Sequence, residues 1–273
     1  MRKFSYIVAA ILLPLLLMSA CASGEAEPRE KDYGVFLSID ASEIDKLEGY
    51  RTVVIDAQYF SSEDIKLLHE KGTIVYTYLN IGSLEDFREY YEEYQDIALG
   101  EYENWEQEQW VDVSDVRWQQ FVQELAAALF EKGVDGFFID NCDVYYYYPD
   151  EKIFSGLTEI LRAVMALEKA VVINGGDAYI TAYRQMHGSA ADIMTAVNQE
   201  EVFSCYDFER AAFGRNTEEE QDYFSAYVEA CKADGMEVYL LEYTRDGELM
   251  KEIQDYCSAQ GFRYYIADSI ELD

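Results

Sequence analysis

Residues 131–143 read Glu-Lys-Gly-Val-Asp-Gly-Phe-Phe-Ile-Asp-Asn-Cys-Asp, and this stretch carries the pattern that decides the fold. Gly133 follows residues 117–132, whose apolar side chains recur three and four positions apart, as on one face of a helix. Glycine there suits a left-handed helix cap. The run at 136–140 is typical of a buried strand and ends in a carboxylate, Asp140. The stretch therefore predicts a helix, a cap, a strand and an acid at the strand's carboxyl end.

The same order recurs along the chain. Several helical segments end at a glycine, as at Gly72, Gly133, Gly235 and Gly261, and a strand follows within a few residues. Helical periodicity covers residues 61–71, 117–132, 151–168, 217–233 and 247–260, and strand-like runs cover residues 35–39, 52–57, 73–79, 136–140, 170–174, 192–197, 237–243 and 263–267.

Eight strands that alternate with helices predict an α/β fold of the (β/α)8 TIM-barrel type, which takes about 250 residues. A doubly wound open sheet is the alternative, but no glycine-rich turn follows the first strand. Residues 85–109, after the third strand, are more than a simple βα unit requires, so we expect an insertion near the site end of the barrel.

The composition limits the classes of function and fold that are possible. The chain has 273 residues, 54 Asp and Glu against 21 Lys and Arg, and a formal charge of −33. No basic face can be assembled for phosphate contacts, so a nucleic-acid partner is excluded. Half of the residues are apolar and 15% are aromatic, which predicts a large core. Only three prolines and no flexible linker favour a single domain.

The N-terminus is typical of a secretory signal peptide over residues 1–20, because two basic residues precede an apolar run at 6–18 that is short for a membrane span. Leu-Met-Ser-Ala-Cys at 17–21 resembles a bacterial lipobox. We therefore expect Cys21 to be lipidated, residues 21–32 to form a flexible tether, and residues 33–273 to form the barrel. The protein would be extracytoplasmic and held to the membrane by lipid only; the alternative is a secreted protein.

Cysteine and histidine chemistry is poorly supported. The four remaining cysteines have no metal-type spacing and could pair, but in so large a core we favour buried, free thiols; they are Cys142, Cys205, Cys231 and Cys257. The chain has two histidines, His69 and His187, both in or beside predicted helices and away from the strand ends. A catalytic triad and a zinc site are therefore not expected, and no nucleotide-cofactor motif is present, so we predict neither metal nor cofactor.

Acids, amides and tyrosines instead gather where the predicted strands end. Glycosidic bonds are cut by two carboxylic acids, one that protonates the leaving oxygen and one that attacks or activates water. Tyrosine rings stack on sugars and their hydroxyls bond sugar hydroxyls. The candidates for such a site are Tyr78, Asn80, Asp140, Asp143, Tyr145, Asn174, Glu200, Glu242 and Tyr243.

Four segments, at 75–88, 110–112, 133–143 and 198–203, resemble glycoside hydrolase family 114, the endo-α-1,4-polygalactosaminidases. The resemblance spans the whole predicted barrel. It implies a TIM barrel that cuts galactosamine-rich exopolysaccharide, with catalytic acids that fall here on Asp140 and Glu200. The neighbouring Glu201 is the alternative to Glu200. The family often has Glu where this chain has Ser83.

As a hypothesis for the mechanism, we expect Asp140 to be the nucleophile or ion-stabilising carboxylate and Glu200 to be the acid and base. Asp143, Asn174 and Tyr78 would orient the sugar, Glu242 and Tyr243 would close the far side, and Asn80 and Tyr145 would line the site. Asp56 and Glu85 are expected to be ion-pair partners, Glu85 with Arg88.

The charge agrees with the implied substrate. De-N-acetylated galactosamine carries an ammonium group, so its polymer is cationic and is attracted by an anionic protein. Two alternatives remain: a surface-tethered polysaccharide-binding protein without hydrolysis, and a hydrolase of another glycan. Divergent directions of Asp140 and Glu200 would favour the binding protein.

Overall fold

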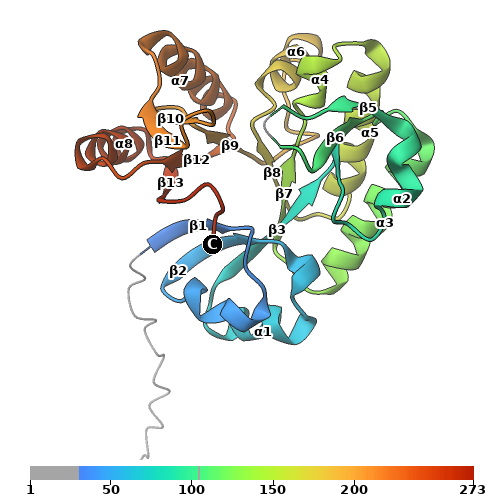
Figure 1. The fold of residues 1–273 in the computed structure, drawn as a ribbon, viewed down its shortest axis with the longest axis horizontal. Coiled ribbons are helices and arrows are strands. Elements are labelled where there is room, and N and C mark those ends of the chain that lie inside the picture. Colours follow the sequence, from blue (N-terminus) through green and yellow to red (C-terminus); the bar gives the residue numbers. More distant parts are fainter. Residues whose placement is uncertain (1–30, 104) are drawn as a thin grey trace, which may run out of the picture.

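The computed structural model describes residues 31–103 and 105–273 (Figure 1). The expected signal peptide at 1–20, Cys21 and the tether as far as residue 30 lie outside the described residues. Strand β1 begins at Lys31, and Lys31 pairs with Tyr50 of β2. Residues 31 and 32, which the sequence assigns to the tether, therefore belong to the folded domain.

Eight parallel strands form the central sheet in the order β1, β2, β3, β7, β8, β9, β12, β13. The two end strands, β1 and β13, lie in contact, so the sheet curves round into a near-barrel, and the predicted TIM barrel is confirmed. Their bounds are Lys31–Phe36, Tyr50–Ile55, Ile74–Asn80, Gly136–Asp140, Ala170–Asn174, Ala196–Glu200, Glu237–Tyr243 and Arg263–Ala267.

Helices follow the strands and cover the outside of the barrel (Figure 1). The five predicted helices are confirmed within three residues at each end, and three further helices, at Tyr91–Tyr94, Val144–Tyr147 and Asp177–His187, were not among them. All four predicted cap glycines have positive φ, from 69° to 98°. Within the described residues no helix is both long and apolar enough to cross a membrane. The helices are α1 (Ser62–Glu70), α2 (Tyr91–Tyr94), α3 (Val116–Glu131), α4 (Val144–Tyr147), α5 (Glu151–Met165), α6 (Asp177–His187), α7 (Glu218–Ala233) and α8 (Gly247–Gln260), with short 3-10 turns at Ala41–Leu47, Ala57–Tyr59 and Gln95–Ile97.

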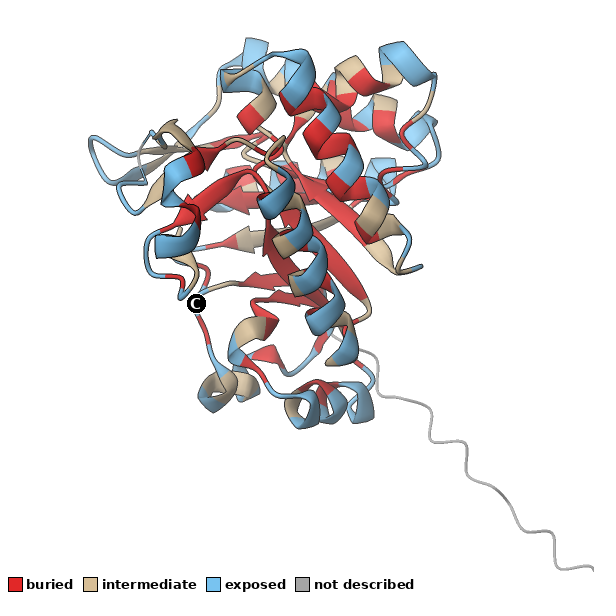
Figure 2. Ribbon diagram, turned by 90° about the vertical axis from the view of Figure 1, so that its right-hand side faces the viewer, coloured by how far each residue is buried: buried red, intermediate tan, exposed pale blue. Residues whose placement is uncertain are grey.

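Side-chain alternation along each strand separates two cores. On β7, Phe137 and Ile139 pack outward against the helices, and Phe138 packs inside the barrel. Figure 2 shows the strands buried while the helices keep exposed outer faces. Because successive residues point to opposite sides, Asp140 continues the inward row above Phe138. The same alternation sends Asn174, Glu200 and Tyr243 inward at the ends of their strands.

Two predicted strands are displaced. The run at 35–39 shares only residues 35 and 36 with β1, which begins at Lys31 and ends at Phe36. The run at 192–197 is assigned to a strand by its composition, whereas residues 191–193 form a turn and β9 starts at Ala196. Ile193 and Met194 are fully buried in that connection. Their apolar character therefore indicates burial and not an extended backbone. As a result, Glu200 is the last residue of β9 and does not follow the strand.

Two small antiparallel sheets lie outside the eight-stranded sheet of the barrel. The predicted insertion contains a three-stranded sheet of β4 (Ser83–Glu85), β6 (Glu108–Val111) and β5 (Ala98–Glu101). A second hairpin pairs β10 (Ser204–Asp207) with β11 (Ala212–Arg215). Residues of the insertion line the main cavity, which confirms its place at the site end.

Of the four cysteines, Cys142, Cys231 and Cys257 are buried and Cys205 is half-buried.

Gly82 lets two barrel loops touch. It links β3 to β4, and a Cβ atom on it would lie 1.8 Å from the carbonyl oxygen of Asn141, which follows β7. That overlap cannot be relieved by a side-chain rotation because the obstacle is backbone. The close approach therefore fixes the insertion against the residue that follows Asp140.

Gly82→Ala should lower the free energy of unfolding by at least about 2 kcal/mol, because the loop after β7 must move to admit the methyl group. Gly247→Ala is the matched control, since a Cβ atom at this position of α8 would have no other atom within 4 Å; it should stay within about 1 kcal/mol of the parent. Urea unfolding measures both values. Equal stability of the two variants would contradict this account of Gly82.

Candidate active site

A cavity of about 1210 Å³ opens at the carboxyl ends of the strands. This is the face where TIM-barrel enzymes carry their active sites. Six of the residues proposed from sequence line it, and they come from β3, β7, β8, β9, β12 and the loop after β7: Tyr78, Asp140, Asp143, Asn174, Glu200 and Tyr243.

One amide joins the two candidate acids. Asn174 Nδ2 donates to Asp140 Oδ1 at 3.0 Å and to Glu200 Oε1 at 2.6 Å. Those two oxygens therefore lie no more than about 5.6 Å apart, which is near the spacing of about 5–5.5 Å found in retaining glycosidases. The acids face one another across β8 and do not diverge.

The direction of the Asn174 amide is set from inside the barrel. Its Oδ1 accepts a hydrogen bond of 2.7 Å from Asn198 Nδ2, and Asn198 Oδ1 accepts one of 3.1 Å from the Tyr33 hydroxyl. Asn198 is fully buried and Tyr33 is 2% exposed. Because Asn198 occupies the oxygen of Asn174, the Asn174 amino group must face the acids.

Each acid also has a tyrosine as a hydrogen-bond partner. The Tyr243 hydroxyl donates to Glu200 Oε2 at 2.6 Å, and Tyr78 hydrogen-bonds Asp140. Burial raises the pKa of Asp140, and hydrogen bonds from Asn174, Tyr78 and the Asn141 amide lower it in part. Burial also raises the pKa of Glu200; the Tyr243 bond lowers it, and the charge of Asp140 raises it again.

Two further acids beside this pair have strongly raised pKa values. Burial, with repulsion from Asp177 and Asp140, raises the pKa of Asp143 to about 7, although the Gly176 amide donates to it at 3.2 Å. Burial and the charge of Glu200 raise the pKa of Glu201 to about 8. Glu201 has a positive φ of 54°, which turns its side chain out of the strand pattern, and its buried Oε1 has no hydrogen-bond donor among the described residues.

Three residues proposed from sequence have other surroundings. Glu242 is fully buried, and its carboxylate accepts hydrogen bonds from the backbone of Val202, Phe203 and Ser204. It precedes Tyr243 on β12, and two consecutive strand residues cannot both face the barrel interior. The expectation that Glu242 closes the site is therefore corrected, because it holds the loop after β9.

Asn80 and Tyr145 are corrected in the same way. Asn80 is 6% exposed, and its amide is used by Ser83 Oγ at 2.7 Å and the Ser83 amide at 3.0 Å. The ring of Tyr145 packs against Phe154 and Tyr179, at 5.6 and 6.0 Å between centroids. Neither residue lines the cavity within the described part of the chain.

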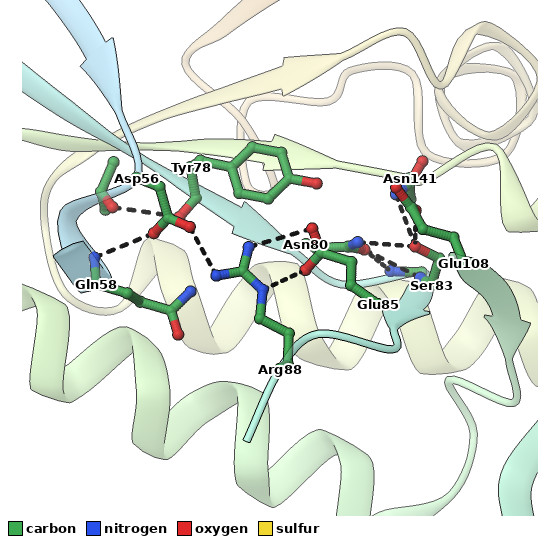
Figure 3. Close-up of polar contacts among 11 residues, drawn as sticks. Asp56, Gln58, Tyr78, Asn80, Ser83, Glu85, Arg88, Glu108 and Asn141 are labelled. Carbon is green, nitrogen blue, oxygen red and sulfur yellow. Dashed lines mark hydrogen bonds and ion pairs between the residues drawn. The ribbon is translucent and has the colours of Figure 1, made fainter. Parts of the chain in front are cut away.

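A polar network in the insertion was not anticipated (Figure 3). Ser83 Oγ accepts hydrogen bonds from Asn80 and from Asn141 Nδ2, and donates to Glu108 Oε2 at 2.6 Å. Tyr102 donates to Asn141 Oδ1 at 3.1 Å. Burial raises the pKa of Glu108 to about 7. Glu108 lines the cavity from β6, where it lies opposite Glu85 of β4 in the antiparallel sheet. Reasoning from the ends of the parallel strands could therefore not find it.

The expected ion pairs are present beside this network. Figure 3 shows the Arg88 guanidinium between two carboxylates. Its Nη1 lies 2.7 Å from Asp56 Oδ2, and its Nε lies 2.6 Å from Glu85 Oε2. All three side chains are largely buried and line the cavity, so the predicted Glu85–Arg88 pair is confirmed and Asp56 shares it.

The cavity wall is strongly acidic. Among the described residues that line it, Arg88 is the single basic side chain and twelve are acids: Asp40, Asp56, Glu85, Glu106, Glu108, Asp140, Asp143, Asp177, Glu200, Glu201, Glu220 and Glu271. No three His, Cys, Asp or Glu side chains between residues 31 and 273, residue 104 apart, are grouped so as to hold a metal ion. His69 and His187 lie in α1 and at the end of α6, as expected.

The raised pKa values make stability depend on pH. Glu108, Asp143 and Glu201 bind protons more tightly in the folded chain, with pKa values of about 7, 7 and 8, than in the unfolded chain. Their contribution is full below about pH 4 and is lost as the pH rises through 7 to 8. The melting temperature should therefore fall by at least about 4 °C between about pH 5 and pH 8.5.

Glu201→Gln should reduce that fall because it removes the acid with the highest of these pKa values. Glu219→Gln, at an exposed position in the first turn of α7, removes the same charge and should leave the fall unchanged. Thermal unfolding by circular dichroism measures all three proteins. A melting temperature that rises over this pH range would refute the burial of these acids.

Solved structures share this architecture. The glycoside hydrolase domain of PelA from Pseudomonas aeruginosa matches with a TM-score of 0.72 and 17% identity, over 89% of this chain and 96% of that chain. Aspergillus fumigatus Ega3, solved as a complex with galactosamine, matches with a TM-score of 0.68 and 15% identity, over 91% and 94% of the two chains. At these identities the likeness shows the fold alone.

An uncharacterised protein of Thermotoga maritima is 24% identical over 172 residues, which are 57% of this chain. The matched region spans about half of that relative's length, 53%. The family model of glycoside hydrolase family GH114 matches residues 18–272, nearly the whole sequence. This match confirms the resemblance seen in the sequence motifs: the chain belongs to glycoside hydrolase family GH114 and is a glycoside hydrolase.

Proposed function

We propose that this glycoside hydrolase cleaves an α-1,4-linked, galactosamine-rich polysaccharide through Asp140 and Glu200. The observation that carries the proposal is the single Asn174 amide that bonds both acids inside a cavity with twelve acidic residues and one arginine. A bound cationic sugar would be attracted by such a wall. The structural neighbour Ega3, solved with galactosamine, supports the same sugar class.

The roles of the two acids follow from their hydrogen bonds. Burial raises the pKa of both acids, but Asp140 has three donors that favour its ionised form, from Asn174, Tyr78 and the Asn141 amide, whereas Glu200 has two, from Tyr243 and Asn174. The ionised Asp140 in turn raises the pKa of Glu200, which favours the protonated form of Glu200. Asp140 is therefore the nucleophile and Glu200 is the proton donor.

In the first step Asp140 bonds to the anomeric carbon while the glycosidic C–O bond breaks and Glu200 protonates the leaving oxygen. In the second step Glu200 takes a proton from water, and the resulting hydroxide displaces Asp140 from the anomeric carbon. A spacing of the retaining class is the one in which the carboxylate attacks the sugar itself. Two displacements at one carbon retain its configuration.

The hydrolase is favoured over a binding protein without activity. A binding site needs no pair of carboxylates at the spacing of a retaining glycosidase, and Asp140 and Glu200 face each other. Hydrolysis of a neutral glycan is the other alternative, and it leaves the acidic cavity wall unexplained.

For the location, we propose an extracytoplasmic protein with a signal peptide at 1–20 and a lipid on Cys21, joined by a tether to the barrel. This rests on the charge, length and lipobox-like end of the N-terminal segment. A secreted protein without the lipid is the alternative. Membrane fractionation and mass spectrometry of the mature N-terminus distinguish the two.

Asp140→Asn and Glu200→Gln should each lower kcat at least about 100-fold on a galactosamine polymer, because each removes a group that must gain or lose a bond or proton. Newly formed reducing ends measure the rate. Glu201→Gln is the matched control: it removes a neighbouring carboxylate that lies outside the Asn174 bridge and should change kcat less than about threefold. Full activity of Asp140→Asn or Glu200→Gln would show that the residue has no part in the mechanism. A loss of kcat in Glu201→Gln, with Glu200→Gln still active, would show that Glu201 is the proton donor.

The charge of the substrate can be tested separately by salt. Using Glu200→Gln to prevent hydrolysis, the dissociation constant for a galactosamine polymer should rise at least about tenfold between about 0.05 and 0.5 M NaCl, because the Debye length shortens severalfold. The N-acetylated polymer, which is neutral, is the control and should change little. Isothermal titration calorimetry measures both. Equal salt dependence of the two polymers would favour a hydrolase of a neutral glycan.

A further inference from the structure

Two aromatic rings stand exposed on one side of the cavity. Tyr59, which ends the 3-10 turn after β2, is 50% exposed, and Phe87, which follows β4, is 53% exposed. Both line the cavity that contains Asp140 and Glu200. Rings that remain this exposed inside a cavity present apolar faces where a ligand would lie.

A single buried cation holds both rings. The Arg88 guanidinium carbon lies 4.9 Å from the centre of the Phe87 ring and 5.9 Å from that of the Tyr59 ring. Arg88 is itself 8% exposed and fixed by hydrogen bonds to Asp56 and to both oxygens of Glu85, as Figure 3 shows. Both rings therefore contact a group that is fixed in place, while about half of each side chain stays exposed.

The supporting group does not repel a cationic ligand. Asp56 and Glu85 together outweigh the charge of Arg88, so the cluster has one net negative charge. Exposed Asp40, in the loop after β1, also lines the cavity and adds another. Apolar rings framed by carboxylates suit a sugar that has one face of C–H groups and an ammonium group at its edge.

The rings lie beside the reacting centre and not in it. Asp140 and Glu200 end β7 and β9, whereas Tyr59 follows β2, which is separated from β7 by β3. Tyr78 of β3 lies between and bonds Asp140. The cavity of about 1210 Å³ exceeds the range of about 300–1,000 Å³ that holds one drug-sized ligand, so it has room for more than the sugar that reacts.

We propose that Tyr59 and Phe87 form an aromatic platform, a second sugar-binding site that stacks a more distant residue of the same polysaccharide chain. The platform rests on the proposed function for the identity of the sugar. It predicts that long chains are bound better than short ones, because only a chain that extends from the acids to β2 reaches the rings.

The test compares a long galactosamine polymer with a trisaccharide, on wild type and on the double variant Tyr59→Ala with Phe87→Ala. Loss of the platform should raise KM for the polymer at least about tenfold, because the double variant removes both apolar ring faces on which the distant sugar would stack. Values of kcat, and all constants for the trisaccharide, should change less than about threefold. Reducing-end assays provide both constants.

Two controls exclude an indirect effect. Tyr146→Ala removes a ring that is 66% exposed and outside the cavity, and it should behave as wild type. The double variant Tyr59→Phe with Phe87→Tyr keeps both rings and should restore the KM of wild type. An equal loss on polymer and trisaccharide, or an unchanged KM for the polymer, would overturn the platform.

Binding measurements separate this proposal from the proposed function. In the Glu200→Gln background, calorimetry with the same polymer should show that removal of both rings raises the dissociation constant at least about tenfold. If wild type binds the polymer but does not cleave it, the proposed function fails while the platform is still judged by this difference. If wild type cleaves the polymer and the rings have no effect on binding, the platform alone fails. If wild type neither cleaves nor binds it, both fail.

Discussion

The amide of Asn174 is the interaction on which the rest of the site depends. A side-chain amide has two hydrogens on one atom, and here they go to Asp140 and Glu200, so one rigid group sets the spacing of both acids. The amide cannot turn over, because Asn198 donates to its oxygen and Tyr33 bonds Asn198 in turn. The barrel interior thus carries a polar chain through otherwise apolar packing, and every buried group of that chain is paired. The chemistry at the top of the barrel is positioned by residues well below it.

The sequence allowed the barrel to be predicted because each repeat contains its own local signals. Glycine caps, helical periodicity and apolar runs are short-range features, and four of the eight strands have the bounds that were expected. Asp140, Asn174 and Tyr243 could be placed at the site because they end such runs. Where the local signal misleads, the error has a physical cause. Ile193 and Met194 were assigned to a strand, but they are apolar because they are buried in the connection before β9. Glu242 was assigned to the site because it adjoins Tyr243, but its side chain points to the opposite side of the sheet.

What could not be predicted depends on contacts between distant segments. Tyr33 and Asn198 are 165 positions apart, and each is an ordinary strand residue until the barrel closes. Glu108 reaches the cavity through the antiparallel pairing of β4 with β6, for which the βα rhythm gives no signal. Ser83 connects it to the loop after β7. The family often has a glutamate at this position, and here a carboxylate from β6 is brought to the serine instead.

The carboxyls with pKa values near 7 and 8 give the cavity a variable charge. Near neutrality Glu108, Asp143 and Glu201 are partly protonated, so the wall is less negative than its twelve acids suggest. If the substrate is the cationic sugar that we propose, it favours their ionised forms, and protons leave as it arrives. Binding would then exchange cations: an ammonium group would replace hydrogen ions, and the net charge of the occupied cavity would change less than the charge of the ligand that enters it.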